Sequence, residues 1–310
     1  MVTAKKMLKA LFDYVFSKKY RFLVNTGLHF YDKVPDEEFL KRNFKLVMGK
    51  ELDLENPKTF NEKLQWLKLY DRKPEYTMMA DKYAVRKYIA EKLGKEYLIP
   101  LLGVWDNPDD IDFDKLPDKF VLKCNHNSGL GMCICKDKST LNIKKVKRFL
   151  KRGLKQNYYL LGREWPYKNI KHKIIAEQYM DDGKGVLTDY KFMCFNGRAE
   201  YCFVCKDRNE KGKARIIVYD RNWNTVNMGR GKIYDDVIES PVNLKKMLEF
   251  ADILSKNIPF VRIDFYEING RLYFGEITFF PGSGLSEFTP KEWDLNLGKM
   301  IDLHIGRAHK

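Results

Sequence analysis

The spacing of apolar residues changes once along this 310-residue chain. From residue 1 to about 95, apolar positions recur with the period of a helix, and Thr59 with Glu62 forms a capping box that predicts a helix start. Residues 96–118 are loop-like, with three prolines and an acidic stretch. From residue 119 onward, short runs of strand-forming residues dominate. We therefore expect an α+β fold in which a mostly helical region precedes antiparallel sheets.

Two Asn-Gly pairs mark hairpins in the strand-rich part of the chain. Asn196-Gly197 separates "DYKFMCF" from "AEYCFVC", and Asn269-Gly270 separates "FVRIDFYEI" from "RLYFGEITFF". Between the hairpins, Ser240-Pro241 predicts the start of a helix through their preference for the N-cap and first helical positions. The expected units are a helical region at 1–95, a first sheet-containing lobe at 96–183 and a second at 184–310.

The balance of charges indicates an anionic partner. There are 57 Lys and Arg against 42 Asp and Glu, a net charge of +15, while a hydrophobic content of 44% is typical of a globular chain. Nucleotide phosphates, acidic glycans, a phospholipid surface and nucleic acid all fit that description. The six cysteines lie mostly in strand-like apolar runs, so we expect structural, reduced thiols and a cytoplasmic protein.

The first 22 residues suggest an amphipathic helix. Lysines interrupt every apolar run, which excludes a signal-peptide core, and no apolar stretch approaches about 18 residues. The apolar positions at helical spacing are Met7, Leu8, Leu11, Phe12, Val15 and Phe16, and the surrounding cations are Lys5, Lys6, Lys9, Lys18 and Lys19. Such a helix can pack on its own domain, or residues 1–22 can lie peripherally on the anionic inner face of a membrane.

The segment "KFVLKCNHNSGLGM" at 119–132 joins two strand-like runs through a glycine loop. A phosphate-binding loop of the P-loop or dinucleotide type would be followed by a helix, whereas here "MCICK" follows, so we expect a hairpin tip. The exposed amides of 128–131 can fold over phosphates as a flap, with Lys123 supplying a fixed positive charge. The alternative is a mobile turn without a ligand. His126, as a lone loop histidine, is expected to face solvent.

The last hairpin carries a pair of carboxylates. Arg262 and Asp264 share one face of their strand, and Glu276 and Thr278 share one face of theirs. An odd-numbered connection such as Asn269-Gly270-Arg271 would place Asp264 opposite Glu276, whereas a two-residue turn would place them on opposite faces. Facing carboxylates favour a cation between them, and hard oxygen ligands suit Mg²⁺. The alternative is two carboxylates on a solvent-exposed face.

The order of these segments resembles that of ATP-grasp enzymes. A lysine-ended strand and glycine flap are followed by "IIAEQYM", "DYKF" and "RIDFY…GEITFFPGSG". The run "NPKTFNEKLQWLKLYDRKPEYTMMADKYAVRKYI" at 56–89, with "FVLKCNHNSG" and "DYKFMCFNG", is similar to the TupA-like branch, named for teichuronopeptide biosynthesis. The resemblance extends from about residue 40 to the C-terminus. It implies two α+β lobes whose antiparallel sheets clasp ATP, with a glycine-flap lid lobe at 96–183 and a metal-binding lobe at 184–310.

The resemblance also implies roles for individual residues. For the nucleotide it implies Lys82, Lys123 and the flap residues Ser128, Gly129 and Gly131. At adenine it implies Glu177 with the backbone of Gln178, Tyr179 and Met180. It further implies Asp189 at the ribose and Lys191 near the phosphates. For Mg²⁺ it implies Asp264 and Glu276, with Thr278 at the position of a further ligand. For charge stabilisation on the transferred phosphoryl group it implies Arg262, Lys191 and Lys123.

Two positions depart from the family pattern. Thr278 stands where ATP-grasp enzymes usually place an asparagine, which weakens the case for a second metal ion. The Rossmann-like lobe that often precedes the grasp core is replaced by residues 1–95, which read as helices. The implied reaction is ATP-dependent activation of a carboxylate to an acyl phosphate, followed by attack of an amine. Members of the branch look linked to cell-surface polysaccharide synthesis, which suggests an amine or amino acid joined to a uronic acid.

Two other classes of function remain open. A glycosyltransferase of surface polysaccharide synthesis would need a nucleotide-sugar site, and Asp110-Ile-Asp112 has the spacing of its usual metal motif. That motif lies in an acidic, linker-like stretch rather than at a strand end. A nucleic-acid-binding protein would use the net positive charge, but no RNA-binding motif is present and the aromatic residues alternate as core residues do. We therefore expect no nucleic-acid partner.

Overall fold

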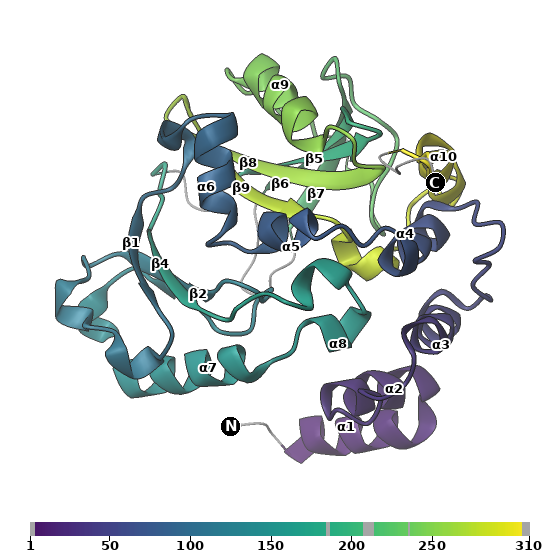
Figure 1. The fold of residues 1–310 in the computed structure, drawn as a ribbon, viewed down its shortest axis with the longest axis horizontal. Coiled ribbons are helices and arrows are strands. Elements are labelled where there is room, and N and C mark those ends of the chain that lie inside the picture. Colours follow the sequence, from purple (N-terminus) through teal and green to yellow (C-terminus); the bar gives the residue numbers. More distant parts are fainter. Residues whose placement is uncertain (1–3, 184–186, 207–213, 235, 306–310) are drawn as a thin grey trace.

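A computed structural model describes residues 4–183, 187–206, 214–234 and 236–305. The first third of the chain is helical, as expected, and its helices run from the lower right of the molecule through its centre to the upper left (Figure 1). They are α1 (Ala4–Phe16), α2 (Lys18–Gly27), α3 (Asp36–Met48), α4 (Phe60–Tyr70), α5 (Glu75–Ala80) and α6 (Val85–Lys92). The capping box predicted at Thr59 and Glu62 is present at the start of α4.

The first sheet has four antiparallel strands in the order β1-β4-β2-β3. They are β1 (Leu101–Trp105), β2 (Phe120–Cys124), β3 (Met132–Cys135) and β4 (Ile174–Gln178). The helix α7 (Ile143–Lys155) covers this sheet, because its Val146 and Leu150 are buried against Phe120 and Leu122. The short helix α8 (Tyr159–Gly162) then leads the chain back toward α3 and α4 (Figure 1). The opposite face of the sheet is left to meet the second sheet.

The second sheet has five antiparallel strands in the order β7-β6-β5-β8-β9. They are β5 (Asp189–Phe195), β6 (Arg198–Lys206), β7 (Arg215–Asp220), β8 (Phe260–Ile268) and β9 (Arg271–Thr278). The helix α9 (Leu244–Ser255) packs on β5, β6 and β8, and α10 (Trp293–Met300) packs on α4. Both sheets are thus antiparallel, which confirms the α+β class and the hairpin predictions at 196–197 and 269–270.

The predicted start of a helix at Ser240-Pro241 is wrong by several residues. The helix α9 begins at Leu244, and the preceding amides of Val242 and Asn243 donate to the carboxylate of Glu267 on β8, at 3.2 and 2.8 Å. A helix needs acceptors for its first amides, and here a distant strand supplies them in place of a local side chain. Sequence preferences for capping could not anticipate that contact.

The apolar core falls into three clusters. The largest joins the second sheet to residues of α4, α5 and α6, including Phe60, Leu64 and Ile89. A second lies between the first sheet and α7, and a third holds α2 and α3 together around Phe39 and Phe44. The six cysteines are free thiols and most are buried, as expected. None of the described helices combines the length and hydropathy needed to cross a bilayer.

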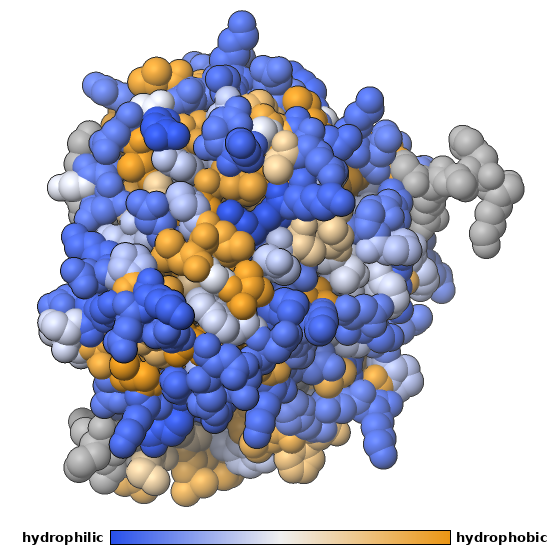
Figure 2. All heavy atoms as spheres, turned by 60° about the vertical axis from the view of Figure 1, so that its left-hand side comes forward, coloured by the Kyte–Doolittle hydropathy of each residue, from blue (hydrophilic) through white to orange (hydrophobic). Residues whose placement is uncertain are grey.

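The helix α1 does not bury its apolar positions. Met7, Leu8, Leu11, Phe12, Val15 and Phe16 are 53–71% exposed, and α1 packs mainly on α2. Figure 2 shows apolar surface at the lower edge of the molecule, at the height of α1 in Figure 1. The interpretation in which these residues pack on their own domain is therefore wrong, because other parts of the described chain leave them uncovered.

Candidate functional site

Five inward-facing side chains form a row across the second sheet. The strand register places Val218, Phe203, Lys191, Asp264 and Glu276 side by side on β7, β6, β5, β8 and β9. Directly paired residues of an antiparallel sheet share a face. The polar part of this row is Lys191, Asp264 and Glu276, and it faces the first sheet.

The prediction that Asp264 lies opposite Glu276 is confirmed, but the predicted connection is wrong. Asn269 and Gly270 form a two-residue turn with φ of 51° and 74°, and Ile268 pairs with Arg271. The register is restored by a bulge between Asp264 and the next residue, where Gly275 is the extra residue on β9. A Cβ at Gly275 would lie 2.9 Å from the carbonyl oxygen of Asp264, so only glycine fits the bulge without displacement.

Two cations bind this carboxylate pair directly. Arg262 donates from Nε and Nη2 to the two oxygens of Asp264 at 2.7 and 2.8 Å, and from Nη2 to Glu276 Oε1 at 2.8 Å. Lys191 Nζ donates to Asp264 Oδ2 at 2.6 Å. Burial would raise the pKa of Glu276, but the charges of Lys82 and Arg262 outweigh it and lower that pKa to about 2. The Glu276 carboxylate is therefore ionised at neutral pH.

The donor set fits a divalent cation of the Mg²⁺ type in part. Asp264 and Glu276 present hard oxygen ligands in register, and the hydroxyl of Thr278 lies 3.2 Å from Glu276 Oε1. The nearest cation to Glu276 Oε2 is Lys82 Nζ, at 4.0 Å, which leaves that oxygen accessible. Both oxygens of Asp264 are engaged by Arg262 and Lys191, so coordination there requires these cations to shift. Among the described residues, no group of three or more His, Cys, Asp or Glu forms a closed metal site.

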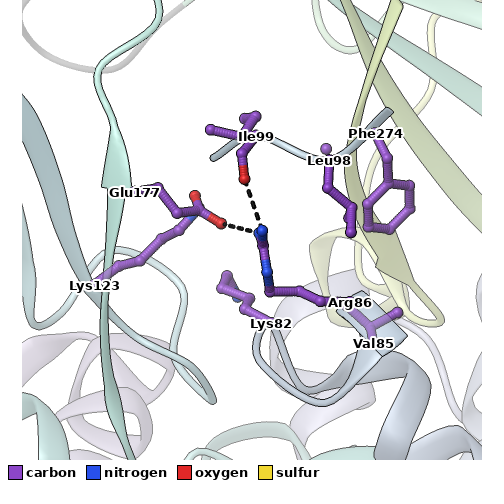
Figure 3. A pocket seen from close by; sticks show the side chains of 9 residues that line it. Lys82, Val85, Arg86, Leu98, Ile99, Lys123, Glu177 and Phe274 are labelled. Atoms are coloured by element: carbon purple, nitrogen blue, oxygen red, sulfur yellow. Dashed lines mark hydrogen bonds and ion pairs between the residues drawn. The ribbon is translucent and has the colours of Figure 1, made fainter. Parts of the chain in front are cut away.

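Facing this row, a second set of charges lines a pocket between the two sheets (Figure 3). Lys123 Nζ lies 2.5 Å from Glu177 Oε2, and Lys82 from the segment before α6 lies beside them. Arg86 on α6 donates to Glu177 Oε1 at 3.2 Å and to the carbonyl oxygen of Ile99 at 2.8 Å. Figure 3 shows Glu177 held between Lys123 and Arg86. The structure thus brings three expected residues together and adds Arg86, which no sequence pattern had singled out.

The pocket has a closed inner part and an open outer part. The inner part, around Lys82, Lys123 and Glu177, measures only about 10 Å³, roughly the room for one water molecule. The outer part measures about 480 Å³ and is lined in part by Gln178 and Met180. This volume is typical of small-molecule sites. Arg86 and Leu98 line both parts.

Tyr179 and Asp189, two further residues expected at the nucleotide, contact different parts of the molecule. Tyr179 lies with its ring centroid 5.9 Å from Lys136 Nζ. Asp189 lies 3.6 Å from Lys191 Nζ and hydrogen-bonds Tyr266, and burial together with Asp189 raises the pKa of that tyrosine. Asp189 therefore lies on the same face of β5 as Lys191, two residues along the strand. Its expected contact with a ribose stays a prediction.

The glycine loop is a hairpin tip between β2 and β3, as predicted. Ser128 is exposed, and Gly129 adopts φ of 86° with open space around it. Gly131 has φ of 76°, and a Cβ there would lie 2.6 Å from Cys124 Sγ and 3.0 Å from the Cα of Gly153 on α7. The tip therefore exposes Ser128 and Gly129, whereas its second glycine is required for packing.

The expectation that His126 faces solvent is wrong. Its side chain is fully buried, its ring stacks on that of His172 at 3.5 Å, and its Nε2 lies 3.1 Å from the carbonyl oxygen of Gln156. The amide of Asn125 donates to Asp81 at 2.8 Å, and that of Asn127 donates to the carbonyl oxygen of Gly153 at 2.8 Å. The polar residues between Lys123 and the flap thus anchor the base of the loop.

A buried ionic network lies behind the row and was not foreseen from the sequence. Lys68 on α4 is fully buried and donates to the carbonyl oxygen and Oγ of Ser283 at 2.9 and 3.0 Å. Burial lowers the pKa of Lys68 to about 8, against the opposing charge of the buried Glu164. Three consecutive residues of the turn that holds Ser283 have positive φ. The glycine-rich sequence "PGSG" is the feature that could have indicated this turn.

Comparison with known proteins agrees with this arrangement. The sequence profile described as TupA-like ATPgrasp matches residues 62–302. A search among curated proteins finds no match. Among solved structures, D-cycloserine synthetase DcsG is similar with a TM-score of 0.44, 12% identity and coverage of 93% of both chains. D-alanine–D-alanine ligase from Bacillus anthracis, complexed with ATP, has a TM-score of 0.40 and 16% identity, and covers 65% of this chain and 55% of its own.

A third structure of this kind is the ATP-grasp ligase PsnB with a precursor variant, Mg and ADP, at a TM-score of 0.40 and 10% identity, with coverage of 78% and 62%. This chain thus spans little more than half the length of the B. anthracis ligase. The profile match is the informative one, because it covers both sheets and every charged residue of the row and pocket described above. The chain belongs to the TupA-like ATP-grasp family, an enzyme family of ATP-dependent ligases.

Proposed function

We propose that this enzyme joins a carboxylate to an amine with conversion of ATP to ADP and phosphate, through an acyl phosphate. The observation that carries the proposal is the convergence of two charged sets from opposite sheets. Lys82 and Lys123 face the carboxylate pair from one side, and the 4.0 Å approach of Lys82 Nζ to Glu276 Oε2 links the two sets. The lid lobe at 96–183 and the lobe at 184–310 would close on the nucleotide between them, next to the helical region at 1–95.

The proposal assigns residues to the binding of adenine, ribose and the metal ion. Gln178 and Met180 line the outer pocket, which would receive adenine against the backbone of residues 178–180. Tyr179 belongs to that backbone segment, Glu177 would bind the adenine amino group and Asp189 the ribose. Asp264 and Glu276 would hold Mg²⁺, with Thr278 as a weaker ligand. The metal ion supplies neutralisation of phosphate charge when bound.

The substrate carboxylate oxygen bonds to the γ-phosphorus while the bond to the bridging oxygen of ADP breaks. Lys123, Lys191 and Arg262 offset the negative charge that is transferred. The amine then bonds to the acyl carbon, phosphate leaves, and the amine loses a proton. The flap of Ser128, Gly129 and Gly131 excludes water, which would otherwise hydrolyse the acyl phosphate.

The proposed acid is a uronic acid of a cell-surface polysaccharide or its precursor, and the proposed amine is an amino acid. The net charge of +15 suits an acidic glycan, and the family profile matches the branch linked to such chemistry. The glycosyltransferase alternative gains nothing from the geometry of its candidate motif. Asp112 caps a local turn by accepting from the amide of Asp114 at 3.1 Å, and its carboxylate pairs with Lys115 at 3.2 Å.

We also propose that α1 lies on an anionic membrane surface at the cytoplasmic face. Its exposed apolar side chains are flanked by exposed lysines, among them Lys6 and Lys9, which have no carboxylate partner among the described residues. Apolar burial and attraction to anionic headgroups then act together. Sedimentation with phosphatidylcholine–phosphatidylglycerol vesicles should be lost in a Leu8→Glu/Leu11→Glu variant and kept in Val242→Glu, which alters a distant exposed residue. Equal sedimentation of all three would exclude α1 as the contact.

Ligand-dependent thermal stabilisation tests the catalytic proposal. Mg·ADP at about 100 times its dissociation constant should stabilise the wild type by roughly 2.7 kcal/mol. Asp264→Asn and Glu276→Gln should lose most of this stabilisation while remaining folded, whereas Glu249→Gln, an exposed residue on α9, should keep it. Stabilisation by UDP-sugars and not by adenine nucleotides would replace the ligase proposal with the glycosyltransferase.

A further inference from the structure

Arg230 lies on the inner side of the second sheet, over the ring of Phe203. It forms no ion pair or hydrogen bond with any described residue, and its Nε is buried without an acceptor. Buried donors in native proteins are nearly always satisfied, and a desolvated charge without a partner is costly. Burial and the charge of Arg262 lower the pKa of Arg230 to about 10, which reflects this unfavourable environment.

The backbone around Arg230 is fixed by a neighbouring segment. Gly229 and Thr289 exchange backbone hydrogen bonds of 2.8 and 2.9 Å. The guanidinium lies over the rings of Phe203 and Phe288, with its carbon 5.6 and 5.8 Å from their centroids. These contacts orient the side chain but satisfy none of its N–H groups. The guanidinium is thus held in place, and no described residue accepts from its buried Nε.

The position of Arg230 relative to the row distinguishes it from the nucleotide-binding cations. Phe203, beneath the guanidinium, is on β6, and the row continues from it to Lys191, Asp264 and Glu276. The nucleotide pocket adjoins the β9 end of this row, through Glu276. With strands about 4.8 Å apart, β6 lies roughly 10 Å from β8. Arg230 is therefore on the side of the carboxylate pair away from the nucleotide pocket.

One further contact places Arg230 beside the turn that follows β9. Its Nη1 lies 3.7 Å from the position that a Cβ of Gly282 would occupy. The chain from Thr278 to Gly282 thus connects the carboxylate pair to Arg230 through a short segment.

We propose that Arg230 binds a non-reacting carboxylate of a substrate, on the side of the carboxylate pair opposite the nucleotide. This inference rests on the proposed ligase function. Because Arg230 contacts neither Asp264 nor Glu276, the carboxylate that it binds is not the one that receives the phosphoryl group. It belongs either to the amino acid that donates the amine or to a second acidic group on the acyl donor. A planar guanidinium pairs with such a group through two parallel hydrogen bonds.

The test uses Arg230→Gln with Lys232→Gln as the matched control. Lys232 is an exposed cation two residues along the same turn, so both variants lose one charge in the same segment. Thermal stabilisation is measured in Mg·ADP with the dicarboxylate D-glucarate against the monocarboxylate D-gluconate, and with glycine against ethylamine. Wild type and Lys232→Gln should respond more strongly to D-glucarate than to D-gluconate, or to glycine and not to ethylamine. Arg230→Gln should bind that carboxylate about tenfold to a hundredfold more weakly, as loss of charged hydrogen bonds predicts.

The two carboxylates distinguish the two sources. A response to glycine that depends on Arg230 places the amine donor there, and a preference for D-glucarate over D-gluconate that depends on Arg230 places the second acidic group of the acyl donor there. Retention of the wild-type response in Arg230→Gln, or no response of the wild type to either carboxylate, overturns the proposal. Loss of the Mg·ADP response in wild type would instead reject the ligase function itself.

A second variant separates binding from structure. Arg230→Met removes an unpaired charge and keeps apolar contact with Phe203, so the melting temperature without ligand should be unchanged or higher. A decrease greater than that of Lys232→Met would mean that Arg230 serves only the packing of its loop, which also overturns the proposal.

Discussion

The burial of His126 makes a measurable prediction about acid stability. The ordinary pKa of histidine is about 6.5, and burial, reinforced by the neighbouring charge of His172, lowers the pKa of His126 to about 4. A folded-state pKa below the unfolded-state value means that the unfolded chain takes up a proton first as pH falls. The stability that His126 contributes is therefore complete above pH 6.5 and is lost between pH 6.5 and about 4.

The magnitude follows from the size of the pKa shift. A difference of about 2.5 pKa units corresponds to roughly 3 kcal/mol, most of it lost by pH 4.5. Because the side chain is fully buried, solvent screening does not reduce this figure as it would at the surface. Replacing His126 by Gln keeps a donor near the carbonyl oxygen of Gln156 and removes the titrating group. Between pH 7 and pH 4, the unfolding free energy of that variant should therefore fall by about 3 kcal/mol less than the unfolding free energy of the wild type.

Urea denaturation at several pH values between 7 and 4.5, with His304→Gln as the control, measures this difference in slope. His304 is exposed, so its replacement should leave the wild-type slope unchanged. Imidazole NMR titration of the folded protein provides a direct check. A folded-state pKa near 6.5 for His126, or equal slopes for wild type and His126→Gln, would refute the argument from burial.

Two further substitutions test the structures that position the site. Gly275→Ala should destabilise the fold by about 1–3 kcal/mol, because its Cβ would lie 2.9 Å from the carbonyl oxygen of Asp264, and should weaken Mg·ADP binding. Gly27→Ala, with open space around it, is the control, and equal stability in denaturant of both variants would remove the bulge as a constraint. Lys68→Met should cost about 3–5 kcal/mol by leaving Glu164 buried without its cation, and Lys68→Met/Glu164→Leu should recover much of it. A double variant less stable than the single one in the same denaturation assay would contradict that reasoning.

Local patterns in the sequence were sufficient for much of the fold. The period of apolar residues identified the helical region and the strands, because helices and strands expose different repeating faces to a core. The Asn-Gly pairs located both hairpins, because each turn needs two residues with positive φ. The alternation of side chains also placed Arg262 with Asp264, and Glu276 with Thr278, on shared faces of their strands.

Contacts between distant segments decided what local patterns could not. The pairing of Asp264 with Glu276 depends on the bulge at Gly275, which the sequence does not distinguish from an ordinary strand glycine. His126 is buried because α7 and the segment around His172 close over it, although its neighbours in sequence are polar.

Arg86 and Arg230 show the same principle at the site. Arg86 lies within the run at 56–89 but no role followed from its place there, and Arg230 lies in none of the quoted segments. The role of Arg86 depends on the distant Glu177, and that of Arg230 on the absence of any carboxylate partner among the described residues. The sequence alone determines which side chains a strand or helix presents on each face, because that depends on local backbone geometry. Only the tertiary structure determines which charges are compensated, because compensation depends on the distance between segments that folding brings together.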